Sequence, residues 1–398
     1  MLNLTQAQYM KNKQIDIIVK YFYPVAAGIE TNILETYSVL VKEGWDVTIH
    51  TSTDTLTEKN ILKPTDELRG LEIKRYLFKK FGYFPKIAWD KTDLICLHNF
   101  DIFPHFRIML YILLRKVLGK KTAKVVLTPH GGFNPEWSTF SPVQAMIKRF
   151  YHNTLGVWLI NQTVAVVRAV STWEKQAMIA SGMKKEKVIM IPNGVEKEAY
   201  MDLEKLASNE IKEQVKSFGR YIIQIGRIYK IKNYETTIRA LAHLPKDVKF
   251  VIAGPIQKDK KYQEYLEILI EELGLTGRVI FVGVIRGIDK YYLIKHAQMM
   301  VHMAIWESFC NVVHEGLSQG LVCIVANNTA LPYLIKDEVN GYCVETKNHK
   351  LLSEKINYVL DNKNSDVIKA MEKRNKVYGL ENSWESVAKN VNKVYSEL

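Results

Sequence analysis

Residues 220–241 read RYIIQIGRIYKIKNYETTIRAL, and this stretch joins an apolar run, a basic loop and an amphipathic run. The segment 220–226 is rich in β-branched residues and ends at a glycine, which is typical of a buried strand. The segment 233–244 has the apolar spacing of a helix. A buried strand that leads through a short loop into a helix is the repeating unit of parallel α/β sheets.

The same alternation continues in both directions along the chain. Further strands are expected at 14–22, 45–52, 92–100, 123–132, 163–171, 187–194, 248–254, 278–283, 299–304 and 321–326. Helices are expected at 29–44, 106–120, 172–182, 262–274, 289–297 and 311–320. We therefore predict an α/β protein of two doubly wound, Rossmann-like domains that face a cleft, with ligands at the carboxyl ends of the strands.

The length of the chain also indicates two domains, because 398 residues exceed what one ordinary hydrophobic core accommodates. A polar stretch rich in Lys and Glu, residues 196–217, interrupts the alternation and is interpreted as the crossover. We place the N-terminal domain at 1–200 and the C-terminal domain from 201 to 379.

Composition excludes several classes of protein. The chain has no uninterrupted run of 18 apolar residues, and its polar first 16 residues lack a signal-peptide core, so we expect a cytoplasmic protein. The four cysteines form no CxxC pair, which disfavours a zinc site or a disulfide framework. No Asp-x-Asp tripeptide offers a compact pair of metal-binding carboxylates, so no metal site is predicted.

The loop after the first quoted strand is a candidate anion site. Gly226, Arg227 and Lys232 lie between the strand and the helix that begins near Asn233. Two cations beside the free amides of a helix N-terminus bind phosphate well. A solvated basic loop is the alternative, and by itself the motif leaves both interpretations open.

A second motif is the pair Glu307 and Glu315 in WESFCNVVHEGLSQG, residues 306–320. On one continuous helix the two carboxylates would lie about 12 Å apart along the axis. Paired carboxylates that hydrolyse a glycosidic bond lie roughly 5–10 Å apart, so an acid/base pair is disfavoured. We place Glu307 in a loop and Glu315 one turn into the next helix, where each accepts hydrogen bonds from hydroxyl groups.

Together these motifs resemble the family 4 retaining glycosyltransferases of the GT-B fold. The resemblance rests on GRIYKIKNYETTIRAL (226–241) and ESFCNVVHEGLSQG (307–320), with an N-terminal glycine loop at 24–30 and TPHGG at 128–132. It extends to AVSTWEKQAMIASG (169–182) and to ENSWESVAKNV (381–391), which resembles the helix that crosses back to the N-domain. Residues 380–398 would therefore complete the N-terminal, acceptor-binding domain, and the C-terminal domain would bind a nucleotide sugar.

The resemblance implies a role for each matching residue. Arg227 and Lys232 would hold the donor diphosphate, Glu307 the donor sugar and Glu315 the ribose, and His130 would lie near the anomeric centre. Backbone groups would complete the donor site at Gly28, Gly226, Ile285, Phe309, Cys310, Asn311 and Val312. Cys310 stands where the family usually has glycine, and Tyr333 where it often has glutamate; these departures concern the sugar rather than the diphosphate.

The implied activity is metal-independent, retaining transfer of a hexose from a nucleoside-diphosphate sugar, UDP or GDP, to a glycan or lipid-linked acceptor. The reaction belongs to surface polysaccharide or glycolipid assembly and needs no cofactor. An epimerase of the same fold is the first alternative. A nucleic-acid-binding protein, suggested by the net charge of +13, is the second, but no recognition module supports it.

The segment 105–124 combines apolar and aromatic residues with clustered Arg and Lys, and the chain has no Asp or Glu between residues 102 and 135. Such a segment is typical of a helix on an anionic membrane surface, which would place the protein at the inner face of the cytoplasmic membrane. An ordinary core helix with a basic end fits the sequence equally well.

Overall fold

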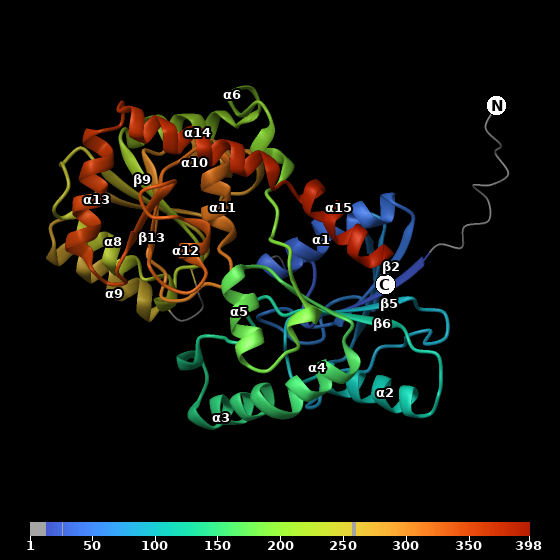
Figure 1. Cartoon of the computed structure of the whole chain (residues 1–398). Coiled ribbons are helices and arrows are strands. Elements are labelled where there is room, and N and C mark those ends of the chain that lie inside the picture. Colours follow the sequence, from blue (N-terminus) through green and yellow to red (C-terminus); the bar gives the residue numbers. More distant parts are fainter. Residues whose placement is uncertain (1–12, 26, 257–259) are drawn as a thin grey trace, which may run out of the picture. The chain divides into compact units, whose positions relative to one another are not determined.

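The computed structural model describes residues 13–25, 27–256 and 260–398 and divides the chain into two compact units. The first unit comprises the chain up to Asn193 together with Trp384–Leu398, and the second is Gly194–Ser383. The sequence placed these divisions at 200/201 and 379/380. The return of the chain to the first unit near its C-terminus agrees with the predicted crossing helix (Figure 1).

The first unit contains an eight-stranded sheet in the order β3-β4-β2-β1-β5-β6-β7-β8. Its β3 pairs with β4 in the antiparallel direction, and the other pairings described in this sheet are parallel. The elements of this unit are β1 (Lys13–Ile18), α1 (Gly28–Lys42), β2 (Trp45–Ser52), β3 (Thr65–Leu68), β4 (Leu71–Tyr76), β5 (Leu94–His98), α2 (His105–Val117), β6 (Lys124–Thr128), α3 (Pro142–Tyr151), α4 (Val157–Thr163), β7 (Val166–Ala169), α5 (Thr172–Ala180), β8 (Val188–Met190) and α15 (Trp384–Ser396).

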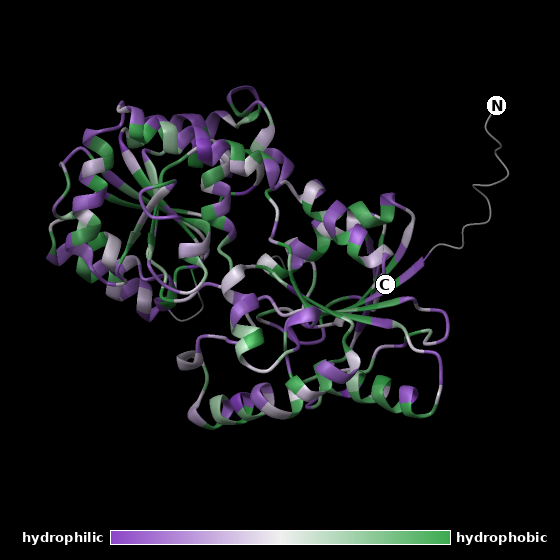
Figure 2. Ribbon diagram, in the orientation of Figure 1, coloured by the Kyte–Doolittle hydropathy of each residue, from purple (hydrophilic) through white to green (hydrophobic). Residues whose placement is uncertain are grey.

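Alternate residues of the central strands face two separate cores. Leu94 and Cys96 of β5 pack into a cluster with α1 and α15, whereas Ile95 and Leu97 pack into a cluster with α2, α4 and α5. Because both faces of the sheet are covered, its strands are apolar at successive positions and not only at every second one. Figure 2 shows this concentration of hydrophobic residues on the strands.

The second unit is built on a six-stranded parallel sheet in the order β11-β10-β9-β12-β13-β14. Its elements are η4 (Lys197–Tyr200), α6 (Leu203–Leu206), α7 (Asn209–Phe218), β9 (Tyr221–Ile225), η5 (Lys230–Lys232), α8 (Tyr234–Leu241), β10 (Lys249–Ala253), α9 (Lys261–Glu272), β11 (Val279–Gly283), α10 (Gly287–Lys295), β12 (Met299–His302), α11 (Asn311–Ser318), β13 (Cys323–Ala326), α12 (Leu331–Leu334), β14 (Gly341–Val344), α13 (His349–Asp361) and α14 (Asp366–Glu381). Helices α8, α9 and α13 lie on one face of the sheet, and α10, α11 and α14 lie on the other (Figure 1).

The stretch 196–217, which the sequence assigned to the crossover, belongs to the second unit and contains η4, α6 and α7. Its polar composition reflects short helices that bury one narrow face: Ile211, Val215 and Phe218 of α7 are buried, and Ser208 caps that helix. Within the described residues, no helix is long and apolar enough to cross a membrane.

Each sheet reverses its strand order at one point, and such switch points position ligand sites in open α/β sheets. In the first unit the reversal lies between β1 and β5, and in the second it lies between β9 and β12. The loops that follow these strands therefore leave neighbouring strands and diverge. The candidate residues follow β1 and β6 in the first unit, and follow β9, β11 and β12 in the second.

Helix α14 packs closely on α11 at Gly379, where an added Cβ would lie 2.3 Å from the Ser318 Cα. We expect Gly379→Ala to destabilise the second unit by about 1–3 kcal/mol, because two helix backbones must separate to admit the methyl group. Denaturant titration measures the change in the free energy of unfolding. The exposed Lys376→Ala on the same helix should change it by less than about 0.5 kcal/mol, and equal effects would contradict the packing argument.

Candidate functional site

The loops after β9 and β12 form the centre of the candidate site. Gly226 follows β9, and its amide donates to the Ala253 carbonyl at 2.9 Å. Gly254, with φ of +147°, follows β10; a Cβ at this position would lie 2.0 Å from the Gly226 carbonyl oxygen. Glycine is thus required where the two strand ends meet, and the loop that carries Arg227 and Lys232 starts from a fixed position.

Direct hydrogen bonds join the β9 loop to the β12 loop. The Ile305 amide donates to the Ile231 carbonyl at 2.8 Å, and the Asn233 side-chain amide donates to the Met303 carbonyl at 2.8 Å. Asn233 adopts the left-handed conformation, with φ of +52°, immediately before α8. The two segments recognised separately in the sequence therefore form one structural unit.

One predicted feature of this loop is only partly present. The sequence expected free amides at the start of α8 beside Lys232. The Tyr234 amide instead donates to the Tyr262 hydroxyl at 3.0 Å, so this amide is not free for an anion. A tyrosine from α9, distant in sequence, takes the position that a phosphate oxygen would need.

Lys232 and Glu307 form a buried ion pair between the two loops, and His302 completes the cluster. The Lys232 ammonium and the His302 Nε2 both contact Glu307 Oε1, the latter at 2.8 Å. Burial alone would raise the pKa of Glu307, but Lys232 and His302 outweigh burial and lower it to about 2. Glu307 is therefore a carboxylate at neutral pH.

The protonation of His302 follows from its partners. Burial lowers the pKa of His302, so the ring is neutral. Its Nε2 faces a carboxylate that can only accept, and its buried Nδ1 has no partner among the described atoms. The proton therefore resides on Nε2, and the ring fixes the orientation of Glu307.

Glu315 in α11 is also held by a lysine, but burial raises the pKa of its carboxyl, whereas the pKa of Glu307 is lowered. Its Oε1 accepts from the Lys290 ammonium at 3.0 Å, and Lys290 also contacts Glu196 at 2.7 Å. Burial opposes the charge on Lys290, but the carboxylates of Glu315 and Glu196 raise its pKa above the usual value. The Tyr291 hydroxyl donates to Glu196 at 3.2 Å and thereby anchors the cluster to α10.

The two carboxylates share one arrangement. Each is anchored through Oε1 by a lysine, and each side chain is 12% exposed. Glu315 Oε2 is buried without a hydrogen-bond partner, and among the described residues Glu307 Oε2 accepts no recorded hydrogen bond. A buried acceptor with no donor is unfavourable unless a ligand supplies one. Glu307 Oε2 is therefore an oriented acceptor for a hydroxyl group, whereas Glu315 Oε2 is enclosed by the protein.

The other donor-site candidates of the second unit lie in the loops after β9, β11 and β12 and in the first turn of α11. Cys310, with φ of +83°, is the N-cap of α11, so Asn311 and Val312 form the first turn as predicted. Phe309 and Cys310 are buried. Arg227 is exposed, and its guanidinium lies 5.1 Å from the centre of the Tyr229 ring. Ile285 is half-buried in the loop between β11 and α10.

His302, Glu307 and Cys310 are the described residues whose ligand types and spacing could hold a metal ion, since their ligand atoms lie within 4.8 Å of one another. The donor set fits a metal poorly, because the Lys232 ammonium already pairs with the Glu307 oxygen. A cation bound there would also need the Cys310 thiolate, and burial raises the pKa of that thiol.

In the first unit, His130 follows β6 and adopts the left-handed conformation, with φ of +52°. Its Nε2 lies 2.9 Å from His98 Nδ1, and His98 Nε2 lies 3.0 Å from the Tyr37 hydroxyl. Burial, aided by the nearby Arg168, lowers the pKa of His130 to about 3, so the ring is neutral. Gly28 begins α1 and is exposed, one residue after Ala27.

The backbone that follows His130 is also held. The buried Glu174 of α5 accepts hydrogen bonds from the amides of Gly131 and Val170. Burial raises the pKa of Glu174 to about 7, although these two amides and Arg168 lower it in part. The loop is thus held at two points: the His98 ring contacts the His130 side chain, and the Glu174 carboxyl contacts the Gly131 amide.

Sequence reasoning missed His98, Lys290, Glu196 and His302. His98 is the last residue of β5, in register with Thr128 of β6. Its closeness to His130 could have been inferred from the adjacency of the two predicted strands. Lys290 and Glu196 carry no such signal, because 94 residues separate them and only the packed helices bring them together.

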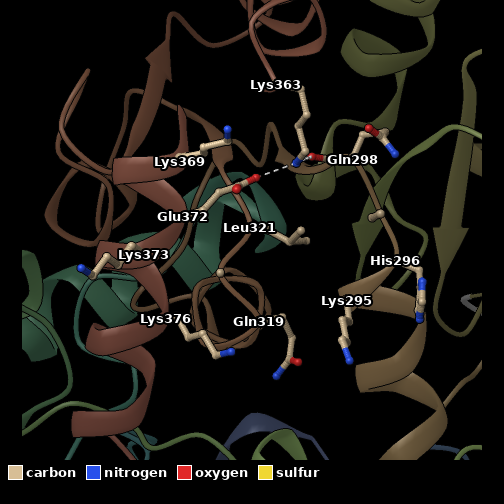
Figure 3. Close-up of a pocket in the computed structure, with 12 residues that line it drawn as sticks. Lys295, His296, Gln298, Gln319, Leu321, Lys363, Lys369, Glu372, Lys373 and Lys376 are labelled. Carbon is tan, nitrogen blue, oxygen red and sulfur yellow. Dashed lines mark hydrogen bonds and ion pairs between the residues drawn. The ribbon is translucent and has the colours of Figure 1, made fainter. Parts of the chain in front are cut away.

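A separate cavity of about 670 Å³ opens at the amino ends of β12 and β13, opposite the loops that carry the candidate residues (Figure 3). Lys363 contacts Glu372 at 2.7 Å there. The remaining lining residues include Lys295, His296, Gln298, Gln319, Leu321, Lys369, Lys373 and Lys376. None of the predicted site residues lines this cavity. The candidate site is defined by the switch point and its buried carboxylates rather than by this hollow.

Comparison with known proteins assigns both halves of the chain. Residues 207–378 match the family model described as glycosyl transferases group 1, and residues 26–199 match the model described as glycosyltransferase family 4.

Curated relatives cover different shares of the chain. The UDP-Gal:alpha-D-GlcNAc-diphosphoundecaprenol alpha-1,3-galactosyltransferase of Escherichia coli is 27% identical over 84% of this chain and 85% of its own length. An N-acetylgalactosaminyltransferase of Campylobacter jejuni, named for a diphospho-undecaprenol acceptor, is 29% identical over 40% of this chain and 42% of its own length. The match to the uncharacterised glycosyltransferase MJ1607 of Methanocaldococcus jannaschii spans 44% of each protein.

Solved structures resemble the whole chain. HepE of Anabaena, in complex with UDP and glucose, superposes with a TM-score of 0.75 at 17% identity and covers 97% of this chain and 100% of its own. WaaG, a glycosyltransferase involved in lipopolysaccharide biosynthesis, gives a TM-score of 0.67 at 14% identity over 96% and 99%. At these identities the likeness establishes the fold.

The low pKa of Glu307 makes a prediction about acid stability. Its unfolded carboxyl binds a proton near pH 4.5 and its folded carboxyl near pH 2, so ionised Glu307 stabilises the fold above about pH 4.5. That contribution is lost as the pH falls toward 2. We expect the free energy of unfolding to fall less between pH 5 and pH 3 in Glu307→Gln than in the wild type.

Denaturant titration at the two pH values measures this difference. The exposed Glu264→Gln on α9 is the matched control and should retain the wild-type pH dependence. A Glu307→Gln variant with the same acid sensitivity as the wild type would show that the ion pair with Lys232 does not stabilise the carboxylate.

Proposed function

The chain belongs to the family 4 glycosyltransferases of the GT-B fold, and from this premise we propose that it transfers a hexose from a nucleoside-diphosphate sugar, with retention of anomeric configuration, to a glycan or lipid-linked acceptor. We propose surface polysaccharide or glycolipid assembly as the process that the reaction serves.

The observation that carries the proposal is the pair of lysine-anchored carboxylates whose Oε2 atoms accept no hydrogen bond from the described residues. Glu307 and Glu315 are held in place before any ligand binds, so each loses little conformational entropy when it accepts hydrogen bonds. A nucleotide sugar presents two sets of vicinal hydroxyls, one on the hexose and one on the ribose. We assign Glu307 to the hexose and Glu315 to the ribose.

The diphosphate between those two sugars requires cations. Lys232 contacts Glu307 and is 16% exposed, and Arg227, five residues earlier in the same loop, is exposed. Lys232 thus connects the sugar-binding carboxylate to the phosphate position. We assign both cations to the diphosphate, with backbone groups of Gly226 and of residues 309–312 as further donors, and Ile285 to the base.

The proposed reaction breaks the bond between the anomeric carbon and the diphosphate oxygen. The acceptor hydroxyl oxygen forms the new bond to that carbon, and its proton passes to the departing diphosphate. Negative charge grows on the leaving group and positive charge on the sugar ring. Preorganised cations at the leaving group and a neutral polar group near the sugar ring lower the barrier. We assign the polar group near the ring to His130, and we place Gly28 beside the diphosphate.

The identities of donor and acceptor are proposed from the relatives. Two structures of Anabaena HepE are complexes with UDP, and the E. coli relative is named for UDP-Gal and for diphosphoundecaprenol. We propose a UDP sugar as donor, with GDP as the alternative, and an acceptor carried on a lipid diphosphate. No cofactor is needed, because Arg227 and Lys232 supply the positive charge that a metal ion would supply.

Donor binding tests the proposal directly. We expect UDP to raise the melting temperature of the wild-type chain more than GDP or ADP, and Lys232→Ala to abolish most of that increase. Transfer by Lys232→Ala should be slower by about 100- to 1,000-fold, which corresponds to about 2.7–4 kcal/mol of transition-state stabilisation. Lys230→Ala, an exposed neighbour, is the control. The donor-site assignment fails if no nucleoside diphosphate stabilises the chain.

Stereochemistry and metal dependence are tested on the product. Proton NMR of a product formed from an α-linked donor should show an α-linked hexose. An excess of EDTA should leave the rate of transfer unchanged. A β-linked product would refute retention, and loss of activity in EDTA restored by Mg²⁺ would refute metal independence. Product formed from the donor alone would indicate an epimerase.

A further inference from the structure

Helix α3 turns its apolar face away from the protein. Val143, Met146, Ile147 and Phe150 have the i, i+3, i+4, i+7 spacing of one helix face, and their side chains are 52–70% exposed. Of the ten residues in α3, only Tyr151 is buried. A soluble helix usually turns such a stripe toward the core, so this stripe requires an external partner.

A second exposed stripe lies on α2, and α4 packs beside it. Leu110, Leu114 and Val117 of α2 are exposed, whereas Ile108, Met109 and Ile112 fill the core beneath. Trp158 of α4 and Leu155 just before it are also exposed. Figure 1 shows α2, α4 and α3 in one row on the same side of the first unit, and Figure 2 shows apolar and polar residues alternating along them.

The charge around these helices has one sign. Between Asp101 and Glu174 the chain contains a single acidic residue, Glu136. The same stretch contains nine basic residues: Arg107, Arg115, Lys116, Lys120, Lys121, Lys124, Lys148, Arg149 and Arg168. Of these, Arg168 is buried, Arg115 contacts Asp90 and Lys148 lies 3.9 Å from Asp101, so basic residues still outnumber acidic ones on this face.

Two of the cations adjoin the apolar stripe itself. The Arg149 guanidinium lies 4.8 Å from the centre of the Trp137 ring, and the Lys148 ammonium lies 5.0 Å from that of Phe140. Trp137, Phe140, Met146 and Arg149 line part of a hollow of about 550 Å³ between the segment 137–140 and α3. Apolar walls with a cation at the rim suit a lipid, which has an acyl chain and an anionic headgroup.

We propose that α3, with the outer stripe of α2 and the exposed Trp158, docks on an anionic lipid bilayer. Apolar residues flanked by an excess of Lys and Arg over acidic residues match the interfacial region of such a membrane. A protein partner would have to combine a large apolar patch with a surplus of acidic groups. The inference rests on the proposed function only for its purpose, which is to bring the enzyme to a lipid-linked acceptor.

The structure thereby changes the sequence interpretation of 105–124. The inner face of α2 belongs to the core, as one alternative expected, while its outer face is apolar and exposed, as a membrane contact would require. We assign the deeper contact to α3, since almost none of its apolar surface serves the core.

Flotation with vesicles of phosphatidylcholine alone, or with added phosphatidylglycerol, tests the proposal on the full chain. We expect the wild type to float with anionic vesicles and only weakly with neutral ones. The double variant Ile147→Ser/Phe150→Ser should bind anionic vesicles at least tenfold more weakly. Lys148→Gln/Arg149→Gln should lose about 30-fold, and only toward anionic vesicles.

The control is Val367→Ser/Leu380→Ser on α14 of the second unit, where the two side chains are 52% and 55% exposed. It should float like the wild type, and circular dichroism should show all variants folded. Absence of wild-type flotation, or equal flotation of the serine variant, overturns the proposal. A dimer that Ile147→Ser/Phe150→Ser abolishes, without vesicle binding, would assign the face to a second copy instead.

Failure here is separable from failure of the proposed function. Vesicle binding uses no donor, and nucleotide stabilisation uses no lipid. A chain that floats but ignores every nucleoside diphosphate would keep the membrane face and lose the donor site.

Discussion

The ion pair between Lys232 and Glu307 is the interaction on which the candidate site depends. It joins the loop after β9 to the loop after β12, the two strands at which the second sheet reverses its order. Removing either partner would leave an uncompensated buried charge, which is far more costly than losing an exposed ion pair. His302 accounts for the remaining orientation of the carboxylate, because its neutral ring can donate to Glu307 only from Nε2.

The same physical solution recurs at Glu315 and in a different form at His130. Lys290 holds Glu315 as Lys232 holds Glu307, and in both cases the lysine contacts the Oε1 atom of the carboxylate. His130 is neutral and is held by His98 and by the Glu174 contact to the next residue. Each of these groups is therefore positioned by neighbours within its own unit.

The first unit resolves a conflict between core and surface differently. Its sheet is covered on both faces, yet α2 has apolar residues on two sides and α3 has them mainly on the outer side. A globular core can absorb only the inner set. The outer set is tolerated in water because many cations lie around it, and the same cations favour an anionic surface over aggregation with another apolar patch.

The amino-acid sequence by itself determined the fold class and the positions of the candidate residues along the predicted strands, loops and helices. Apolar runs broken by glycine and followed by helical periodicity predict strand and helix locally. In the structure Gly226 follows β9, Lys232 ends η5, Glu307 lies in the loop after β12 and Glu315 lies in α11. These are short-range properties, set by backbone preference and burial within about ten residues.

Tertiary structure alone decided which side chains meet. Lys290 contacts Glu315 and Glu196, and the Tyr262 hydroxyl accepts a hydrogen bond from the Tyr234 amide. These contacts form because helices far apart in sequence pack on one sheet. Likewise, the pattern of α3 shows that one face is apolar but cannot show whether that face meets the core or the solvent. Periodicity defines a face of a helix, whereas packing against the rest of the chain defines its direction.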